Sequence, residues 1–230
     1  MSNYPLLGNG KYYTSRRGKI LGIVLHVTAG AQDLGMVGTD NSAANTIRYG
    51  QTTTRAASWH AISDTDSAIY CLPDTYTAFH VRNYNAHTLG LEICNADARW
   101  DNKPEAWIDA TLRNSADICR NWARKYGLPL TLVDKRGVDS AIANGRKFGF
   151  TYHSYLDPSR RVDPGRTFPW HRFIALVNNG TVLARGSKGP SVTILQRRLI
   201  ELCNELGKWG ADGDFGDATE RAGRAPQQAA

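Results

Sequence analysis

The sequence predicts an α/β protein with a mixed central β-sheet flanked by helices, followed by a small α-helical unit. Three observations lead to this prediction. Strand-like apolar runs alternate with helical patterns, polar side chains follow the ends of those runs, and a separate helical pattern begins near residue 188. Such alternation favours a sheet covered by helices, with a site at the strand ends. The 230 residues suffice for one full-sized domain and a small second one.

The first predicted strand lies in "KILGIVLHVTAG" (residues 19–30), a run of β-branched residues and leucine that carries His26 near its end. A short helix is predicted over 41–51. The segments "SWHAIS" (58–63) and "SAIYCL" (67–72) are typical of two strands, because the polar turn "DTD" separates them.

The segment "HTLGLEICN" (87–95) alternates regularly between apolar and other residues, which predicts a strand. Leucine and isoleucine occupy one face of this strand, and Glu92 lies on the other. Apolar residues then recur at spacings of three and four over 104–126, between Pro104 and "YGLP". This spacing predicts a long amphipathic helix.

Two domains are predicted, over residues 1–178 and 188–230, with a linker over 179–187. The second begins with a helical repeat of apolar residues, and "GADGDFGDATERA" follows it. The members of that repeat are Val192, Leu195, Leu199 and Leu202. An EF-hand calcium loop starting at Asp212 is excluded, because Asp217 and Gly223 would stand where that loop needs glycine and glutamate.

The composition indicates a globular protein without a membrane span, since 41% of residues are hydrophobic and no apolar run approaches ~18 residues. The formal charge of +7 suits nucleic acid or an anionic cell-wall polymer, although scattered positive residues fit an ordinary solvated surface equally well. The N-terminus lacks the apolar stretch of a secretory signal, so we expect a cytoplasmic protein unless something releases it. Four dispersed cysteines, Cys71, Cys94, Cys119 and Cys203, are expected to be reduced.

Two of the six histidines, His26 and His153, stand where apolar or aromatic runs give way to loops. Taken singly, each is more often an ordinary histidine than a metal ligand. Together with Asp163 they offer three nitrogen and oxygen ligands, which is the set that zinc takes at a hydrolytic site while its fourth position holds water. Glu92 is a candidate base for that water; the alternative is a buried ion pair between Glu92 and an arginine.

Four segments in order carry a resemblance to a known family: "IVLHVTAG", "SWHAIS", "AFHVRNYNAHTLGLEI" and "YHSYLDPSRRVDPGRTFPW". Over roughly residues 18–176 the sequence resembles the zinc-dependent N-acetylmuramoyl-L-alanine amidases of the amidase-2 group, which are related to peptidoglycan recognition proteins. The resemblance implies that His26, His153 and Asp163 hold Zn²⁺ and that Glu92 is the catalytic acid/base. It further implies that His80 lies near the substrate, whereas His60 supports the sheet.

Two positions depart from the family pattern. Arg161 stands where the family commonly has a lysine two residues before the third ligand; arginine can stabilise an oxyanion but is a poor general acid. Trp59 stands where some phage members carry a catalytic tyrosine, and an indole cannot replace a phenol in proton transfer. We expect Trp59 to be either a wall of the substrate groove or part of the core.

The C-terminal segment from "RGSKGPSVTILQ" onwards resembles a type-1 peptidoglycan-binding module, a three-helix unit that anchors enzymes to the wall. Gly223 and Pro226 stand where that module has apolar helix residues. Because proline inside a helix costs about 3 kcal/mol, we expect an incomplete module with a frayed end.

The resemblance implies a peptidoglycan hydrolase that cleaves the amide bond between N-acetylmuramic acid and L-alanine with zinc-activated water. We expect a monomeric phage endolysin that lies in the host cytoplasm until release and then lyses the cell by attacking peptidoglycan, without membrane insertion. An alternative is a recognition protein that binds peptidoglycan without cutting it, which the complete ligand set disfavours. Nucleic-acid binding is a third possibility, for which the sequence has no recognition motif.

Overall fold

The structure is a computed structural model that describes residues 4–8, 12–16, 18–28, 41–178, 183, 185–188, 190–201 and 205–224. The chain divides into two compact units, Met1–Phe168 and Pro169–Ala230. The expected domain boundary at residue 178 stays a prediction, and the expected linker lies mostly outside the described residues. Among the described residues, no helix combines the length and the apolar character needed to span a bilayer.

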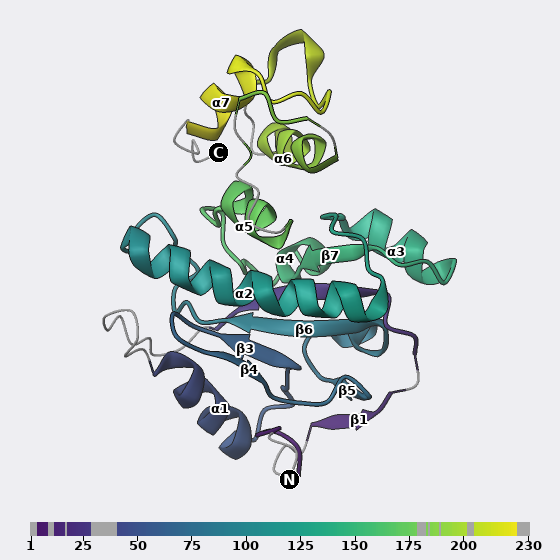
Figure 1. The fold of residues 1–230 in the computed structure, drawn as a ribbon. Helices are drawn as coiled ribbons and strands as arrows, with labels where there is room; N and C mark the ends of the chain where they lie inside the picture. The colour runs from purple at the N-terminus through teal and green to yellow at the C-terminus, as the bar shows by residue number, and fades with distance from the viewer. Residues whose placement is uncertain are drawn as a thin grey trace. The chain divides into compact units, whose positions relative to one another are not determined.

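A five-stranded mixed sheet forms the centre of the first unit (Figure 1), which confirms the predicted fold class. Its spatial order is β4-β3-β6-β2-β7, and every neighbouring pair is parallel except β3 with β4. The strands are β2 (Gly22–Val27), β3 (Ala61–Ser63), β4 (Ala68–Tyr70), β6 (Thr88–Ile93) and β7 (Gly149–Tyr152). A separate antiparallel pair joins β1 (Tyr13–Ser15) to β5 (Tyr76–Ala78).

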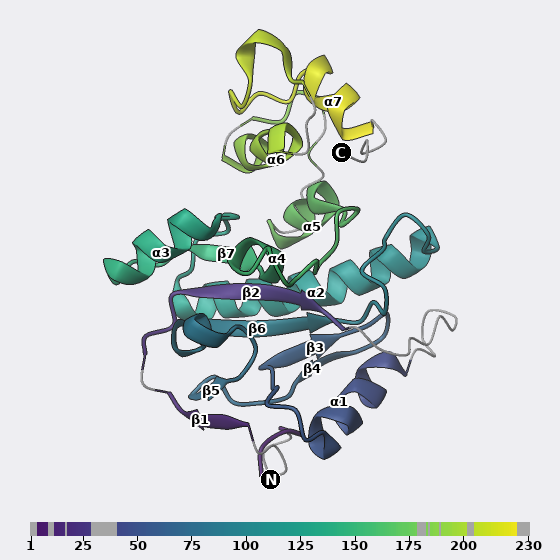
Figure 2. The same ribbon diagram turned by 180° about the vertical axis from the view of Figure 1, so that it is seen from behind.

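Helices cover the sheet. The long helix α2 (Glu105–Tyr126) crosses one face in Figure 1, and in Figure 2 β2 and β6 lie in front of it. Ser63 of β3 contacts Ser115 of α2 through their hydroxyl oxygens, 2.8 Å apart. The remaining helices of this unit are α1 (Ser42–Thr52), the 3₁₀ helix η1 (Arg82–His87), α3 (Lys135–Ala143) and the short α4 (His153–Leu156).

The predicted strands around His26, at 58–63, at 67–72 and at 87–95 are confirmed, as are the helices near 41–51 and 104–126. The strands β1 and β5 and the helix α3 were not predicted from the sequence. Three-residue strands such as β1 and β5 are too short to show a periodicity, and pairing between them is what stabilises them.

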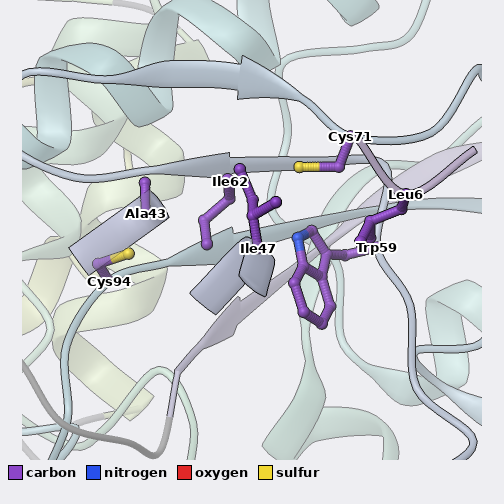
Figure 3. Packing of buried hydrophobic residues seen from close by; sticks show 7 residues of the cluster. All are labelled: Leu6, Ala43, Ile47, Trp59, Ile62, Cys71 and Cys94. Carbon is purple, nitrogen blue, oxygen red and sulfur yellow. The ribbon is translucent and has the colours of Figure 1, made fainter. Parts of the chain in front are cut away.

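A hydrophobic cluster packs α1 against the sheet and contains Trp59 (Figure 3). Its buried members are Leu6, Ala43, Ile47, Trp59, Ile62, Cys71 and Cys94. Cys71, Cys94 and Cys119 are buried, while Cys203 lies outside the described residues. Burial raises the pKa of the Cys71 thiol to about 12, so this cysteine behaves as an apolar core residue.

The second unit has a small core of its own. Its elements are α5 (Trp170–Val177), α6 (Pro190–Glu201), the 3₁₀ helix η2 (Gly207–Trp209) and α7 (Asp217–Arg224). Gln196 is buried, donates to Asp212 Oδ1 at 2.8 Å and accepts from the Gly213 backbone N–H at 2.7 Å, which ties α6 to the "DGDFG" turn. Gly223 lies within α7, whereas Leu202 and Pro226 of the sequence analysis lie outside the described residues.

The segment around Asp163 is anchored to the rest of the first unit by its backbone. The Asp163 carbonyl accepts from the Ser154 N–H at 3.0 Å, and the Trp100 indole N–H donates to the Pro164 carbonyl at 2.9 Å. Gly165 has φ +100°, and a Cβ atom at this position would overlap the carbonyl oxygen of Ala98. Glycine is therefore required for the chain to pass this close to Ala98.

We expect Gly165→Ala to lower the free energy of unfolding by about 3 kcal/mol or more, since it adds a backbone clash to an unfavourable φ. Gly145→Ala is the matched control, because Gly145 also has a positive φ but has nothing within 4 Å of the added methyl group. This control should lose only about 1–2 kcal/mol. Urea unfolding of both metal-free variants measures the difference; equal losses would contradict the close approach of Gly165 to Ala98.

His60 is buried and joins three segments, in agreement with its expected support of the sheet. Its Nδ1 accepts from the Gly90 N–H at 3.0 Å, and its Nε2 lies 3.1 Å from the Tyr76 carbonyl. Nε2 also lies 2.9 Å from Nη2 of Arg16. Because the Gly90 N–H can only donate, Nδ1 of His60 carries no proton and the ring is neutral. Burial lowers the pKa of His60 to about 3, and the nearby Arg16 guanidinium lowers the pKa further.

Stability should therefore decrease as the pH falls below about 6.5, because the unfolded chain binds the His60 proton more readily than the folded chain. We expect His60→Gln to reduce this pH dependence between about pH 6 and 4 by up to about 1.4 kcal/mol per pH unit. Ile62→Val, a buried control, should lower stability by about 0.5–1.5 kcal/mol equally at each pH. Chemical unfolding across this range tests the prediction, and an unchanged slope in His60→Gln would refute it.

Candidate active site

Parallel pairing brings the candidate residues to one edge of the sheet. His26 near the end of β2 pairs in register with Glu92 of β6, so their side chains lie on the same face. His153 follows Tyr152, the last residue of β7, and Tyr152 pairs with Leu25 of β2. Because the strands are parallel, their carboxyl ends meet at the same edge, where sites in α/β sheets form.

The three expected metal ligands converge. The Nδ1 atoms of His26 and His153 are 2.9 Å apart, and Oδ2 of Asp163 lies 3.2 Å from Nδ1 of His153 and 3.4 Å from Nδ1 of His26. All three side chains are buried, with exposed fractions of 3% for His26, 6% for His153 and 9% for Asp163. The structure thus groups these residues although 127 positions separate the two histidines.

This donor set fits a metal ion better than a purely hydrogen-bonded cluster. A single proton can form a hydrogen bond between only two of the three ligand atoms that face one another. The lone pair of the third atom then points at its neighbours in a buried site. A tetrahedral zinc ion with bonds of about 2.0–2.1 Å sets its ligand atoms about 3.3 Å apart, close to the three observed distances. Two neutral imidazoles and a carboxylate are also a ligand chemistry that suits zinc.

The electrostatics keep His26 neutral and Asp163 ionised. Burial lowers the pKa of His26 to about 4, against the opposing hydrogen bond with Asp163. For Asp163, burial alone would raise the pKa, but the hydrogen bonds with His153 and His26 together hold the pKa of this carboxyl below its usual range. A neutral imidazole and a charged carboxylate are the forms that bind a cation.

Glu92 is half-buried beside this cluster. Burial raises the pKa of Glu92 to about 8, the Asp163 carboxylate adds to the rise, and Arg161 opposes it. A carboxyl whose pKa lies near neutrality can both take up and return a proton, which is what acid/base catalysis requires. The alternative, a buried ion pair of Glu92 with an arginine, has no support in the described contacts, because Arg161 acts on Glu92 only through its charge.

Arg161 extends from the turn between the second and third ligands and is exposed. Its backbone N–H donates to the Asp157 carbonyl at 3.1 Å, and the Asp157 carboxylate pairs with Arg160 at 2.6 Å. These bonds agree with Asp157 as a turn-forming residue. The Arg161 charge affects the pKa of both His26 and Glu92, so the guanidinium is within electrostatic reach of the site.

His80 packs against a ligand. Its Nδ1 lies 3.0 Å from Nε2 of His26, and its Nε2 lies 3.2 Å from the Thr88 hydroxyl. Its ring lies over Gly90, where a Cβ atom would come within 2.7 Å of the ring. The expected contact of His80 with substrate stays a prediction; the described contacts of this ring are with His26, Thr88, Gly90 and the ring of His60.

Trp59 is a core residue in this structure. Only 4% of its surface is exposed, and its indole packs in the cluster of Figure 3. A substrate would have almost no access to this ring, so we assign Trp59 to the core, which was the other interpretation of the sequence. Alternation explains the difference, since neighbouring residues before β3 point to opposite sides and His60, not Trp59, approaches Gly90.

Three residues that hold the site residues in place were not predicted from the sequence: Thr88, Asn85 and Trp100. Asn85 Oδ1 accepts the backbone N–H groups of His80 and Val81 at 3.1 and 2.7 Å. Gly90 was a usable signal, because glycine inside a strand often marks a close approach by another group.

Comparison with known proteins identifies the family of this chain. Residues 16–166 match the Amidase_2 family, described as N-acetylmuramoyl-L-alanine amidase. A probable N-acetylmuramoyl-L-alanine amidase of Bacillus licheniformis is 27% identical over 239 residues, which cover 88% of this chain and 60% of the relative. N-acetylmuramoyl-L-alanine amidase A of Achromobacter lyticus is 28% identical over 155 residues, 61% of this chain and 80% of the relative.

Solved structures share the fold. The Staphylococcus aureus hydrolase AmiA has a TM-score of 0.52 at 22% identity, covering 74% of this chain and 80% of its own. A mutant endolysin from Bacillus subtilis has a TM-score of 0.51 at 21% identity, covering 74% and 93% respectively. The chain spans about 60% of the length of the two Bacillus licheniformis relatives it matches. From the family match over residues 16–166, the chain belongs to the Amidase_2 family.

Proposed function

We propose that this protein is a zinc-dependent N-acetylmuramoyl-L-alanine amidase that hydrolyses the amide bond between N-acetylmuramic acid and L-alanine in peptidoglycan. The observation that carries the proposal is the convergence of His26, His153 and Asp163 beside the carboxyl of Glu92. Family membership and the names of the relatives support the same reaction.

His26, His153 and Asp163 would hold the zinc ion through Nδ1, Nδ1 and a carboxylate oxygen. When bound, zinc supplies Lewis acidity that polarises the scissile carbonyl and lowers the pKa of water toward about 7. Since all three ligands come from the ends of neighbouring strands or from anchored segments, they need little rearrangement to bind the ion.

Glu92 moves the proton. As the water oxygen bonds to the carbonyl carbon, Glu92 accepts the water's proton, and it then returns a proton to the nitrogen of L-alanine as the C–N bond breaks. The raised pKa of Glu92 suits the second step, because a carboxyl that binds its proton near neutrality is available as an acid.

Arg161 stabilises the negative charge that develops on the carbonyl oxygen. Its guanidinium stays charged at any working pH, so it contributes electrostatically and leaves proton transfer to Glu92. This division of roles accounts for arginine at the position where the resembling family commonly has a lysine.

The finer assignments also belong to this proposal. We propose a phage endolysin that lyses the host from its cytoplasm, with bacterial peptidoglycan as partner. The predicted domain over residues 188–230, after a linker at 179–187, would be a partial wall-binding module. A named endolysin among the structures that share the fold supports the assignment.

We expect Glu92→Gln to lower kcat by at least about 100-fold, because it removes the proton acceptor while keeping the size of the side chain. The measurement counts new L-alanine N-termini released from purified cell walls. Zinc stoichiometry should remain one per chain, since Glu92 is not a ligand. Glu205→Gln, an exposed carboxylate change in the second unit, serves as the control and should leave kcat unchanged.

A chelator should abolish release of L-alanine N-termini, and added zinc should restore it. Release that persists in both the chelated protein and Glu92→Gln would overturn the mechanism. Wall binding without any new N-terminus would instead favour the recognition protein that does not cut peptidoglycan.

We expect Arg161→Ala to lower kcat by about 100-fold with a smaller effect on KM, because oxyanion stabilisation acts in the transition state. Arg161→Lys should recover part of the loss, since it restores a positive charge. Arg160→Ala is the neighbouring control: Arg160 pairs with Asp157, and its loss should change kcat little. If Arg160→Ala and Arg161→Ala were equally impaired, the specific role of Arg161 would be wrong.

A further inference from the structure

We propose that Thr88 and His80 are positioning residues that fix His26 as the Nε2–H tautomer, so that the Nδ1 lone pair of His26 faces the metal site. The inference rests on the ligand set of the proposed function. It concerns a chain of hydrogen bonds that runs from the Tyr84 backbone through Thr88 and His80 to His26.

The direction of donation along this series of hydrogen bonds is set at the Tyr84 carbonyl. The Thr88 hydroxyl oxygen lies 2.8 Å from the Tyr84 carbonyl oxygen. A carbonyl can only accept, so the single proton of the hydroxyl is donated there. Thr88 therefore has only lone pairs to offer to its second partner, Nε2 of His80 at 3.2 Å.

The position of the proton on each ring then determines its position on the next ring. His80 must carry its proton on Nε2 to donate to Thr88, and a neutral imidazole has one N–H, which leaves Nδ1 of His80 as an acceptor. That Nδ1 lies 3.0 Å from Nε2 of His26, so His26 donates its own Nε2–H. The Nδ1 of His26 is left unprotonated, 2.9 Å from Nδ1 of His153 and facing Asp163.

The surroundings prevent His80 from turning away. Asn85 Oδ1 accepts the backbone N–H groups of His80 and Val81, which fixes the chain where the ring begins. The ring fills the space above Gly90 that a Cβ atom would take, and Thr88 is fully buried. His80 is thus held between Thr88 and His26 by packing as well as by hydrogen bonds.

These hydrogen bonds matter because His26 has a competing tautomer. With its proton on Nδ1, His26 would donate to Oδ2 of Asp163, which is 3.4 Å away, and two of the three ligand atoms would be occupied by their own hydrogen bond. Partners of the non-ligating nitrogen commonly fix the tautomer of metal-binding histidines, and their loss typically weakens metal binding about 10–100-fold.

The test compares Thr88→Val and Thr88→Ser in the whole chain. Valine has the shape of threonine without the oxygen, whereas serine keeps the hydroxyl. We expect Thr88→Val to weaken zinc binding, measured by competition with a chromophoric chelator, by about 10–100-fold, and Thr88→Ser to retain most of the wild-type affinity. Equal affinity of Thr88→Val and the wild type would overturn the proposal.

A second measurement does not depend on zinc or on activity. Two-bond ¹H–¹⁵N NMR spectra of the metal-free wild type distinguish Nδ1–H from Nε2–H rings, and we expect Nε2–H for both His26 and His80. An Nδ1–H ring at His26 would refute the proposal even if the enzyme were active. Conversely, Nε2–H rings in a protein that releases no L-alanine would support the positioning role and refute the proposed function, so the two failures are distinguishable.

Discussion

The parallel pairing of β2 with β6 and β7 is the constraint on which the site depends. It sets His26 opposite Glu92 and ends β7 at Tyr152, one residue before His153. In a parallel sheet all strands end at the same edge, so side chains far apart in sequence become neighbours without any long-range loop contact. A shift of one residue in the β2–β6 register would send Glu92 to the other face of the sheet, against α2.

Holding three polar ligands in a buried site is costly, and the fold offsets this cost through neighbouring polar groups. Buried polar atoms need partners, and among the described residues the ligand atoms of His26, His153 and Asp163 contact one another. Around them, backbone bonds anchor Asp163, and Trp100 holds the residue that follows it. The result is a site with fixed lone pairs, which is the arrangement that favours binding a cation over partial internal hydrogen bonding.

Much of the sheet, and the strand ends near which His26, His153 and Asp163 meet, could be predicted from the sequence for a physical reason. A strand of six residues carries its own alternation, as around Glu92, and the ends of strands indicate where a site forms. The positioning role proposed for His80 could not be predicted, because it depends on how Asn85 of η1 and Gly90 of β6 place the His80 ring. Trp59 was ambiguous for a related reason: which face a residue at the start of a strand occupies depends on the partner strands.

Zinc K-edge X-ray absorption of the purified protein with one equivalent of zinc tests the central claim most directly. The account predicts a nearest shell of nitrogen and oxygen atoms only, at about 2.0–2.1 Å, with the outer-shell scattering of two imidazole rings that disappears in part when His153 is replaced by alanine. A sulfur shell near about 2.3 Å, or a shell unchanged in His153→Ala, would contradict the assignment of His26, His153 and Asp163 as the ligands of one ion.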